Sequence, residues 1–197
     1  MLERARAQDP EARNRIVSLY LPLVYIWCRK AGLSAPEAED VGQEVLLAVN
    51  NSLATFRRDR PGDSFRGWLR TLTANKIRDH WRSNPRQRGA EGGSDALTRL
   101  QQLPADESSD AADPVGTEEG PGDEMKALLR RALEQIRPTF KEATWQAFWR
   151  VVVDRQRPDL VAGQLGLSVN AVRLAKGRVL RRFREEFKDL VDLSPGP

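Results

Sequence analysis

The sequence predicts an all-α fold of two small helical domains joined by a flexible acidic linker, the second domain containing a helix-turn-helix. Apolar residues recur at spacings of three and four in both halves, and no segment alternates as a strand does. The charges divide in the same way. Residues 1–83 carry 14 basic and 10 acidic side chains, residues 84–124 carry 3 and 10, and residues 125–197 carry 15 and 8. We therefore expect domains at 1–83 and 125–197 with the linker at 84–124, where no apolar period persists.

Three long helices are expected in the first domain. The first begins at Asp9, with Pro10 just inside it, because an acidic cap followed by proline is typical of a helix start. Ser34 and Glu37 have the spacing of a capping box for the second helix. The third helix covers residues 65–82, with apolar residues at intervals of four. These three helices are expected to form one core.

In the second domain, residues 158–184 read as a helix, a tight turn and a second helix. Gly166 can adopt the left-handed conformation that ends a helix, and Ser168 can cap the next one. This order is typical of a helix-turn-helix, in which the second helix enters the major groove of DNA.

The second helix of this motif carries a basic face, with no acid from Asn170 to Arg184. A helix face that is only solvated normally carries charges of both signs. Arginine and asparagine offer paired donors to guanine and adenine edges, and flanking cations neutralise phosphates. The pattern favours DNA binding over the alternative of a solvated surface. The residues expected to take part are Asn170, Arg173, Lys176, Arg178, Arg181 and Arg182.

The third helix of the first domain has a polar face and aromatic residues beside a loop that contains glycine and proline. Its polar face presents Thr71, Asn75, Arg78 and Arg82. Aromatic side chains at helical spacing belong to a core more often than to a base-stacking platform. A loop of this composition beside basic residues can nevertheless hold an unstacked base. The residues alone leave both alternatives open.

A second face of the second helix is acidic and polar. Asp40, Gln43, Glu44 and Leu47 lie at i, i+3, i+4 and i+7, opposite the apolar stripe. By itself this face indicates solvation, since acids early in a helix also favour its dipole.

The composition argues against several classes of function. The chain has one cysteine and one histidine, too few for a disulfide framework, a histidine-based catalytic triad or a zinc cluster. We expect no catalytic residues, no metal and no cofactor. The sequence shows neither the apolar run of a signal peptide nor a span of roughly 18 to 20 apolar residues, so no membrane partner and a cytoplasmic location are expected.

The order of these pieces resembles the extracytoplasmic-function (ECF) sigma factors of bacterial RNA polymerase. EAEDVGQEVLLAV is similar to the acidic region-two helix of that family, and SFRGWLRTLTANKIRDHWR is similar to the helix that reads the minus-ten element. Residues 125–190 resemble region four. The resemblance covers roughly residues 10–83 and 125–190 and leaves the linker unmatched.

The resemblance implies three contact surfaces and a set of partners. The first binds the coiled coil of the polymerase largest subunit, the second reads the minus-ten element and holds a flipped non-template base, and the third reads the minus-thirty-five element. The polymerase flap, for the C-terminal domain, and an anti-sigma factor are further implied partners. The implied core-binding residues are Asp40, Gln43, Glu44 and Leu47; the minus-ten residues are Arg57, Arg58, Ser64, Thr71, Asn75, Arg78 and Arg82; the minus-thirty-five residues are Ser168, Asn170, Arg173, Leu174, Lys176, Arg178, Arg181 and Arg182.

Two glycines depart from the family pattern. Gly42 replaces a larger apolar residue in the docking helix, and Gly177 stands where a polar side chain is common. Glycine inside a helix costs about 1 kcal/mol relative to alanine. At Gly177 the missing side chain can permit a close approach of the backbone to DNA.

The length of the linker can be compared with the distance between the two promoter elements that the chain is expected to bind. A coil of 41 residues has a root-mean-square span of about 35 Å. Promoter elements two helical turns apart are separated by roughly 70 Å. The linker must therefore be stretched when both elements are bound.

Two other functions remain as alternatives. A helix-turn-helix regulator would bind operator DNA as a dimer without polymerase. A nucleic-acid enzyme would need a divalent metal and more converging carboxylates than this sequence has. The dependence of DNA binding on core polymerase distinguishes a sigma factor from a regulator.

Overall fold

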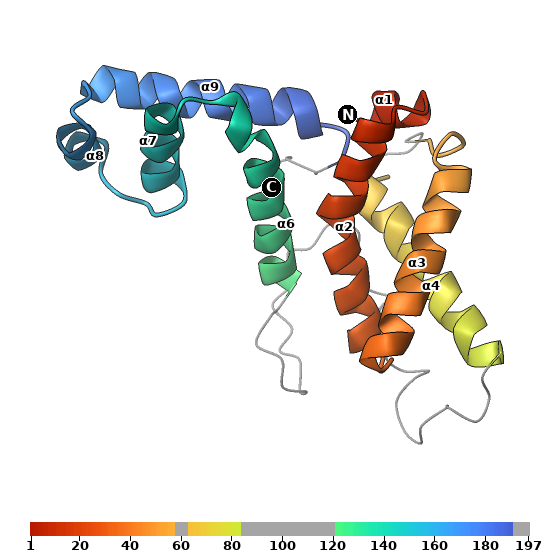
Figure 1. The fold of residues 1–197 in the computed structure, drawn as a ribbon. Coiled ribbons are helices and arrows are strands. Elements are labelled where there is room, and N and C mark those ends of the chain that lie inside the picture. The colour runs from red at the N-terminus through yellow and green to blue at the C-terminus, as the bar shows by residue number, and fades with distance from the viewer. Residues whose placement is uncertain (58–62, 84–120, 191–197) are drawn as a thin grey trace. The chain divides into compact units, whose positions relative to one another are not determined.

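The structure is a computed structural model that describes residues 1–57, 63–83 and 121–190, and every regular element in these ranges is helical (Figure 1). An all-α fold is therefore confirmed for the described part of the chain. The chain divides into two compact units. Unit 1 comprises Met1–Leu128 together with Asp189–Pro197, and unit 2 comprises Leu129–Lys188. The predicted linker lies outside the described residues as far as residue 120.

Four helices make up most of unit 1, and α3 packs against both α2 and α4. Their bounds are α1 (Leu2–Arg6), α2 (Pro10–Lys30), α3 (Ala35–Ser52) and α4 (Phe65–Ser83). Figure 1 shows α2, α3 and α4 side by side. We did not predict α1, because five residues are too few to show an apolar period.

The predicted helix starts are confirmed. The Asp9 carboxylate accepts hydrogen bonds from the backbone N–H groups of Glu11 and Ala12 at 3.0 and 3.2 Å, and Pro10 is the first residue of α2. Ser34 and Glu37 form the expected capping box at the start of α3. Such caps satisfy backbone donors that have no partner within the helix.

An aromatic cluster joins the helices of unit 1. The ring centroid of Phe65 lies 5.0 Å from Tyr20, 5.7 Å from Phe56 and 5.4 Å from Trp68. Phe65, Tyr20 and Phe56 are buried, and Trp68 is half-buried. Aromatic rings at these separations stabilise a core beyond their buried area. Trp68 therefore packs as a core residue with one exposed side.

The remaining helices run through unit 2, and α6 crosses the boundary between the units. Their bounds are α6 (Pro121–Ile136), the 3₁₀ turn η2 (Arg137–Thr139), α7 (Glu142–Val152), α8 (Pro158–Leu165) and α9 (Val169–Phe187). A helix was expected only from Met125, whereas α6 begins at Pro121 and has Asp123 and Glu124 in its first turn. Proline and acids favour a helix start, which explains the earlier beginning.

Small apolar residues fill the core where α7, α8 and α9 meet. The cluster consists of Ala147, Val161, Ala162, Val172 and Ala175. These short side chains let the helices approach closely. As a result, one face of α9 is buried and the opposite face is exposed.

The turn between α8 and α9 has the predicted chemistry. Gly166 follows α8 in the left-handed conformation, with φ 63°, and the Ser168 hydroxyl accepts a hydrogen bond from the backbone N–H of Ala171 at 3.1 Å. A residue other than glycine would be strained at this φ. The turn thus fixes where α9 starts, and DNA binding by α9 stays a prediction.

Candidate functional site

The first candidate surface is the acidic and polar face of α3. Asp40, Gln43, Glu44 and Leu47 are all exposed, and Leu47, at 65%, is the most exposed of the large hydrophobic side chains that the structure describes. Glu44 pairs across to α4, where its Oε2 lies 3.4 Å from Lys76 Nζ. Asp40 has no ion pair within the described ranges. This face therefore offers one unpaired acid and one exposed leucine.

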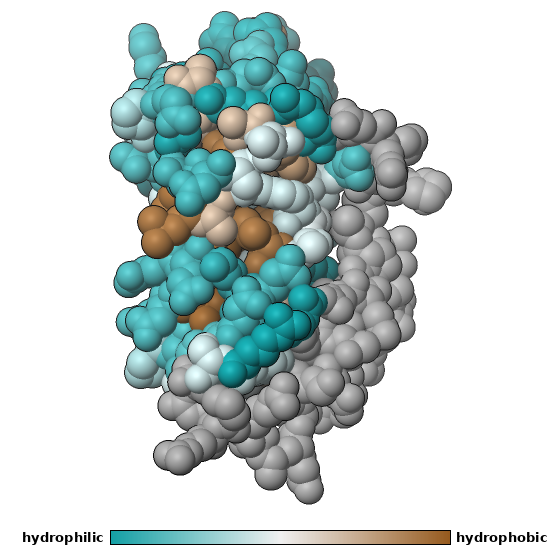
Figure 2. Space-filling model, turned by 90° about the vertical axis from the view of Figure 1, so that its right-hand side faces the viewer, coloured by the Kyte–Doolittle hydropathy of each residue, from teal (hydrophilic) through white to brown (hydrophobic). Residues whose placement is uncertain are grey.

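Figure 2 shows one face of the molecule. It is mostly hydrophilic, with hydrophobic side chains gathered in a narrow band between hydrophilic regions. A small exposed apolar area is common on monomeric proteins and by itself assigns no partner.

The second candidate surface is the outer face of α4. Thr71, Asn75 and Arg82 are exposed, and Arg78 is half-buried. Asn75 Oδ1 accepts a hydrogen bond from Arg78 Nη1 at 2.8 Å, so the amide orients the guanidinium. Arg82 lies 3.5 Å from Asp79 one turn away. The expected minus-ten residues of the helix therefore share one face.

Of the loop before α4, the structure describes Arg57, Asp63 and Ser64. Arg57 is exposed and donates to the backbone carbonyls of Ala54 and Phe56. Ser64, in contrast, is only 9% exposed, and its hydroxyl caps α4 by accepting from the Gly67 N–H at 3.0 Å. A contact between Ser64 and DNA would require this cap to open, so its position fits a structural role better than the predicted one. Arg58 lies outside the described residues.

The third candidate surface is the exposed face of α9. Every expected minus-thirty-five residue is exposed, and the set is Ser168, Asn170, Arg173, Leu174, Lys176, Arg178, Arg181 and Arg182. Two of the arginines are engaged by acids, since Arg181 lies 4.0 Å from Glu185 and Arg182 lies 3.2 Å from Glu186. Arg173 and Lys176 have no acidic partner in the part of the chain that the structure describes. These two cations, together with Arg178, which also lacks such a partner, are more available to DNA than Arg181 and Arg182.

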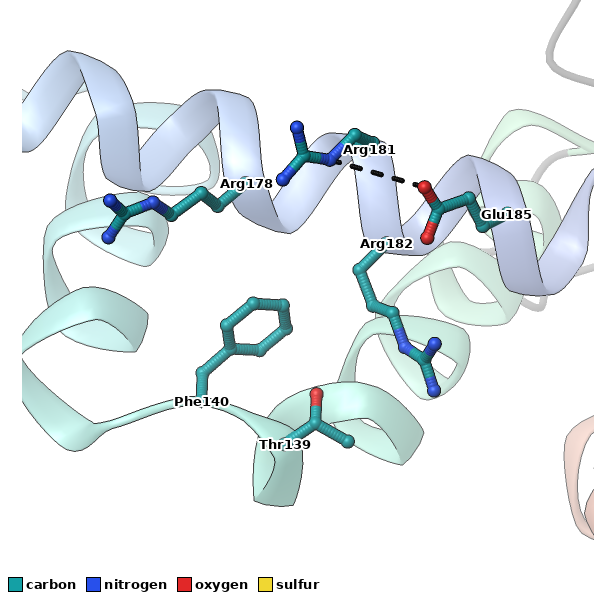
Figure 3. Close-up of a pocket in the computed structure, with 6 residues that line it drawn as sticks. All are labelled: Thr139, Phe140, Arg178, Arg181, Arg182 and Glu185. Carbon is teal, nitrogen blue, oxygen red and sulfur yellow. Dashed lines mark ion pairs between the residues drawn. The ribbon is translucent and has the colours of Figure 1, made fainter.

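Three of the α9 arginines, Arg178, Arg181 and Arg182, also line a hollow of about 310 Å³. Figure 3 shows Arg182 reaching from α9 toward the side where Thr139 lies and Arg178 extending beside the helix, while Arg181 is joined to Glu185 by an ion pair at its Nε. Arg178 and Arg182 therefore lie at one edge of the exposed face. This placement suits contacts with the DNA backbone better than contacts with base edges.

Two arginines on α4 were missed by sequence reasoning. Arg66 and Arg70 are buried, at 6% and 7% exposed, and the Arg70 guanidinium lies 5.6 Å from the centroid of the Trp27 ring. The signal was present in the sequence, because both residues directly follow members of the apolar ridge, Phe65 and Leu69.

The expectations about metals and membrane spans can be compared with the described residues. They contain no group of three or more histidine, cysteine, aspartate or glutamate side chains that could hold a metal ion. Cys28 is buried. In the same residues, no helix has the length and apolar character needed to cross a membrane.

Comparisons with known proteins identify the family. The family model of sigma-70 region 2 matches residues 16–87, which include α3 and α4. The RNA polymerase sigma factor CnrH of Cupriavidus metallidurans is 30% identical over 168 residues, covering 83% of this chain and 78% of CnrH. The chain belongs to the ECF sigma factors of RNA polymerase.

A second relative in sequence agrees with this membership. The ECF RNA polymerase sigma factor SigD of Mycobacterium tuberculosis is 29% identical over 194 residues, covering 94% of this sigma factor and 82% of SigD. Two solved structures also align, the RsbN–BldN complex at 17% identity and CnrH in complex with the cytosolic domain of CnrY at 20%. Each alignment has a TM-score of 0.37. The alignment with the RsbN–BldN complex covers 94% of this chain and 98% of the solved chain. The alignment with CnrH covers 95% of this chain and 94% of the solved chain. SigD and CnrH are both named as RNA polymerase sigma factors.

Proposed function

We propose that this sigma factor binds core RNA polymerase through α3, opens the minus-ten region through α4, and reads the minus-thirty-five element through α9. The observation that carries the proposal is the division of α3 into two faces in a member of this family. One face is buried in unit 1, and the other, with Asp40, Gln43, Glu44 and Leu47, is exposed. Within the described residues, the one ion pair of this face joins Glu44 to Lys76, and the rest of the face is open to a partner.

The partner proposed for α3 is the basic coiled coil of the polymerase largest subunit. Opposite charges across an interface speed association and fix its register. Asp40 supplies an acid that is not neutralised within the described part of this chain, and Leu47 adds apolar area to bury on binding. Glu44 is partly committed to Lys76, so its role is smaller than that of Asp40.

The role proposed for α4 is strand opening. The Asn75 amide holds the Arg78 guanidinium on the outer face of the helix, so both groups are oriented before DNA arrives. Unstacked bases of the non-template strand would then be held by this face and by the preceding loop. Protein contacts with a flipped base offset an unstacking cost of a few kcal/mol, and no ATP is needed.

The role proposed for α9 is recognition of the upstream element in duplex DNA. Asn170, Arg173 and Leu174 lie on the exposed face near the N-terminal end of the helix, where base contacts are made in helix-turn-helix proteins. Lys176, Arg178 and Arg182 are proposed to contact phosphates. The polymerase flap and an anti-sigma factor are proposed as further partners of the chain.

A regulator that binds operator DNA without polymerase is the competing function. Membership of the sigma factors favours the proposal over this alternative. The two functions differ in one property, because only a sigma factor needs core polymerase to act at its promoter.

Replacing Asp40 tests the proposed polymerase surface. Asp40→Lys should weaken binding to purified core enzyme by at least about tenfold, because a cation would face the basic coiled coil. Glu39→Lys is the matched control, since Glu39 is also exposed but lies outside the i, i+3, i+4 and i+7 set. Binding is measured by pull-down or fluorescence anisotropy, and melting curves verify the fold. Equal affinities of the two folded variants would remove α3 from the polymerase interface.

A further inference from the structure

Glu124 is a buried carboxylate in the first turn of α6. Its side chain is 4% exposed, and it belongs to unit 1. It is also the last of eight acids between residues 104 and 124, a stretch without a single basic residue. Acidic residues are rarely buried unless they are paired. The surroundings of Glu124 therefore require explanation.

Three donors from two helices converge on this carboxylate. Trp27 Nε1 lies 3.1 Å from Glu124 Oε2, Lys30 Nζ lies 3.0 Å from Oε1, and Arg66 Nη2 lies 3.0 Å from Oε2. Trp27 and Lys30 are one turn apart on α2, and Arg66 lies on α4. Both carboxylate oxygens are thus hydrogen-bonded, with two of the three donors charged. Charge-assisted hydrogen bonds of this kind are the strong ones in proteins.

The site fits an ionised carboxylate. Burial raises the pKa of Glu124, but hydrogen bonds from Lys30 and Trp27 and the charge of Arg66 outweigh it and hold the pKa below its usual range. Two of the donors are also held in place by burial within unit 1. Trp27 is fully buried and the Arg66 side chain is 8% exposed, so neither donor could turn to water if the carboxylate left.

The site discriminates between adjacent acids. Asp123 precedes Glu124 in α6, yet its side chain is 44% exposed and pairs with Lys126 at 2.8 Å. The same segment thus presents two carboxylates, and only one enters the site. This selectivity distinguishes the site from a general attraction between an acidic segment and a basic surface.

We propose that Trp27, Lys30 and Arg66 form a carboxylate-binding site that docks the C-terminal end of the acidic segment, through Glu124, onto unit 1. We further propose that this docking is a closed state of the free protein and that Glu124 leaves the site when the protein acts at a promoter. The second statement rests on the proposed function, and the first does not.

The reason for release is the reach of the chain. Ser83, at the end of α4, and Glu124 both belong to unit 1. While Glu124 is docked, the segment between them starts and ends on the same unit, so its length adds no reach between unit 1 and unit 2. Promoter elements two helical turns apart lie roughly 70 Å from each other. Undocking makes the length of the segment available once Asp189 and Leu190, which unit 1 also includes, leave it as well.

Hydrogen exchange of the full-length chain tests the docking. Glu124→Gln and Glu124→Ala should each speed exchange of the backbone amides of residues 125–128 by at least about tenfold, because the start of α6 loses its attachment and opens more often. Asp123→Asn is the matched control, as it removes the same charge one residue away, and it should leave these rates unchanged. Equal rates in Glu124→Ala, Asp123→Asn and the unmodified protein would overturn the proposal.

A second variant guards against general destabilisation. Lys30→Met removes a partly exposed donor, and alone it should speed the same amides. Combined with Glu124→Ala it should add nothing further, because the two residues act through one contact. Additive effects of the two substitutions would contradict a shared site.

The release is tested with core polymerase. In the complex of the unmodified protein with core enzyme and promoter DNA, residues 125–128 should exchange as fast as they do in free Glu124→Ala. Persistent protection in that complex would overturn the release but not the docking. Because the first experiment uses no polymerase, its failure leaves the proposed sigma function untouched, and a failure of polymerase binding leaves the docking intact.

Discussion

Individual cations on α9 differ in how fully acids engage them, and this difference predicts their roles. Arg181 and Arg182 are paired with Glu185 and Glu186, whereas Arg173 is exposed without an acidic partner among the described residues. Arg173 can therefore turn to a base edge without breaking an ion pair. The proposed reading of the upstream element depends on this residue more than on the paired arginines.

Alanine substitutions separate base contacts from phosphate contacts. Arg173→Ala should cost about 1 to 3 kcal/mol on the cognate upstream element and little on a scrambled one. Lys176→Ala should weaken binding to both sequences alike and reduce the salt slope by about one. Binding titrations at several salt concentrations measure both effects. A uniform loss from Arg173→Ala would place that residue among the phosphate contacts.

Cys28 provides a test of the packing of α2. The thiol is buried, and burial raises its pKa to about 12. It therefore stays protonated at neutral pH, and the thiolate is the reactive form. A thiol reagent such as DTNB should react slowly with the native protein at pH 8 and rapidly after urea denaturation. Rapid labelling of the native protein would contradict a packed α2.

At the level of helices, replacing two glycines with alanine tests whether an exposed helix backbone contributes to DNA binding. Gly177 lies inside α9, and a Cβ there would meet nothing within 4 Å. A Cβ at Gly42, inside α3, would lie 3.5 Å from Leu21 Cδ1, which is an ordinary contact. Neither helix needs glycine for space, so alanine at either position should stabilise the protein by about 1 kcal/mol.

The effect of the two substitutions on DNA should differ. Gly177→Ala is expected to raise Tm and to weaken binding to the upstream element, because the exposed backbone of α9 approaches DNA there. Gly42→Ala should raise Tm and leave DNA binding unchanged, since Gly42 is buried. Thermal melting and DNA titration check both variants. Unchanged DNA affinity in Gly177→Ala would show that α9 does not approach DNA closely at this point.

Caps and apolar periods made the helices of both units predictable. The burial of charged side chains was not predictable in the same way. Asp9, Ser34, Gly166 and Ser168 mark helix ends through local hydrogen bonds and φ preferences that the sequence contains. The burial of Arg66 depends on Glu124, which is 58 residues away along the chain. No local pattern reveals such a partner, so the site around Glu124 could not be predicted from the sequence.

At the scale of the whole molecule, the proposed function places two DNA-binding surfaces on separate units and a polymerase-binding surface on one of them. The positive charge is concentrated in residues 1–83 and 125–197, whereas residues 84–124 are acidic. Cations on both units attract DNA, and the acids between them are repelled by it. This distribution suits a protein that contacts two elements of one promoter while polymerase holds it in place.

Transcription in vitro tests this account most directly. Purified core polymerase and this sigma factor are combined on a library of genomic promoter fragments, and transcripts are sequenced. We expect defined transcripts from a small set of promoters that share two spaced elements, no such transcripts with core enzyme alone, and their loss with Asp40→Lys. Sequence-specific binding of the chain to the same DNA without core enzyme, together with the absence of core-dependent transcripts, would contradict the account.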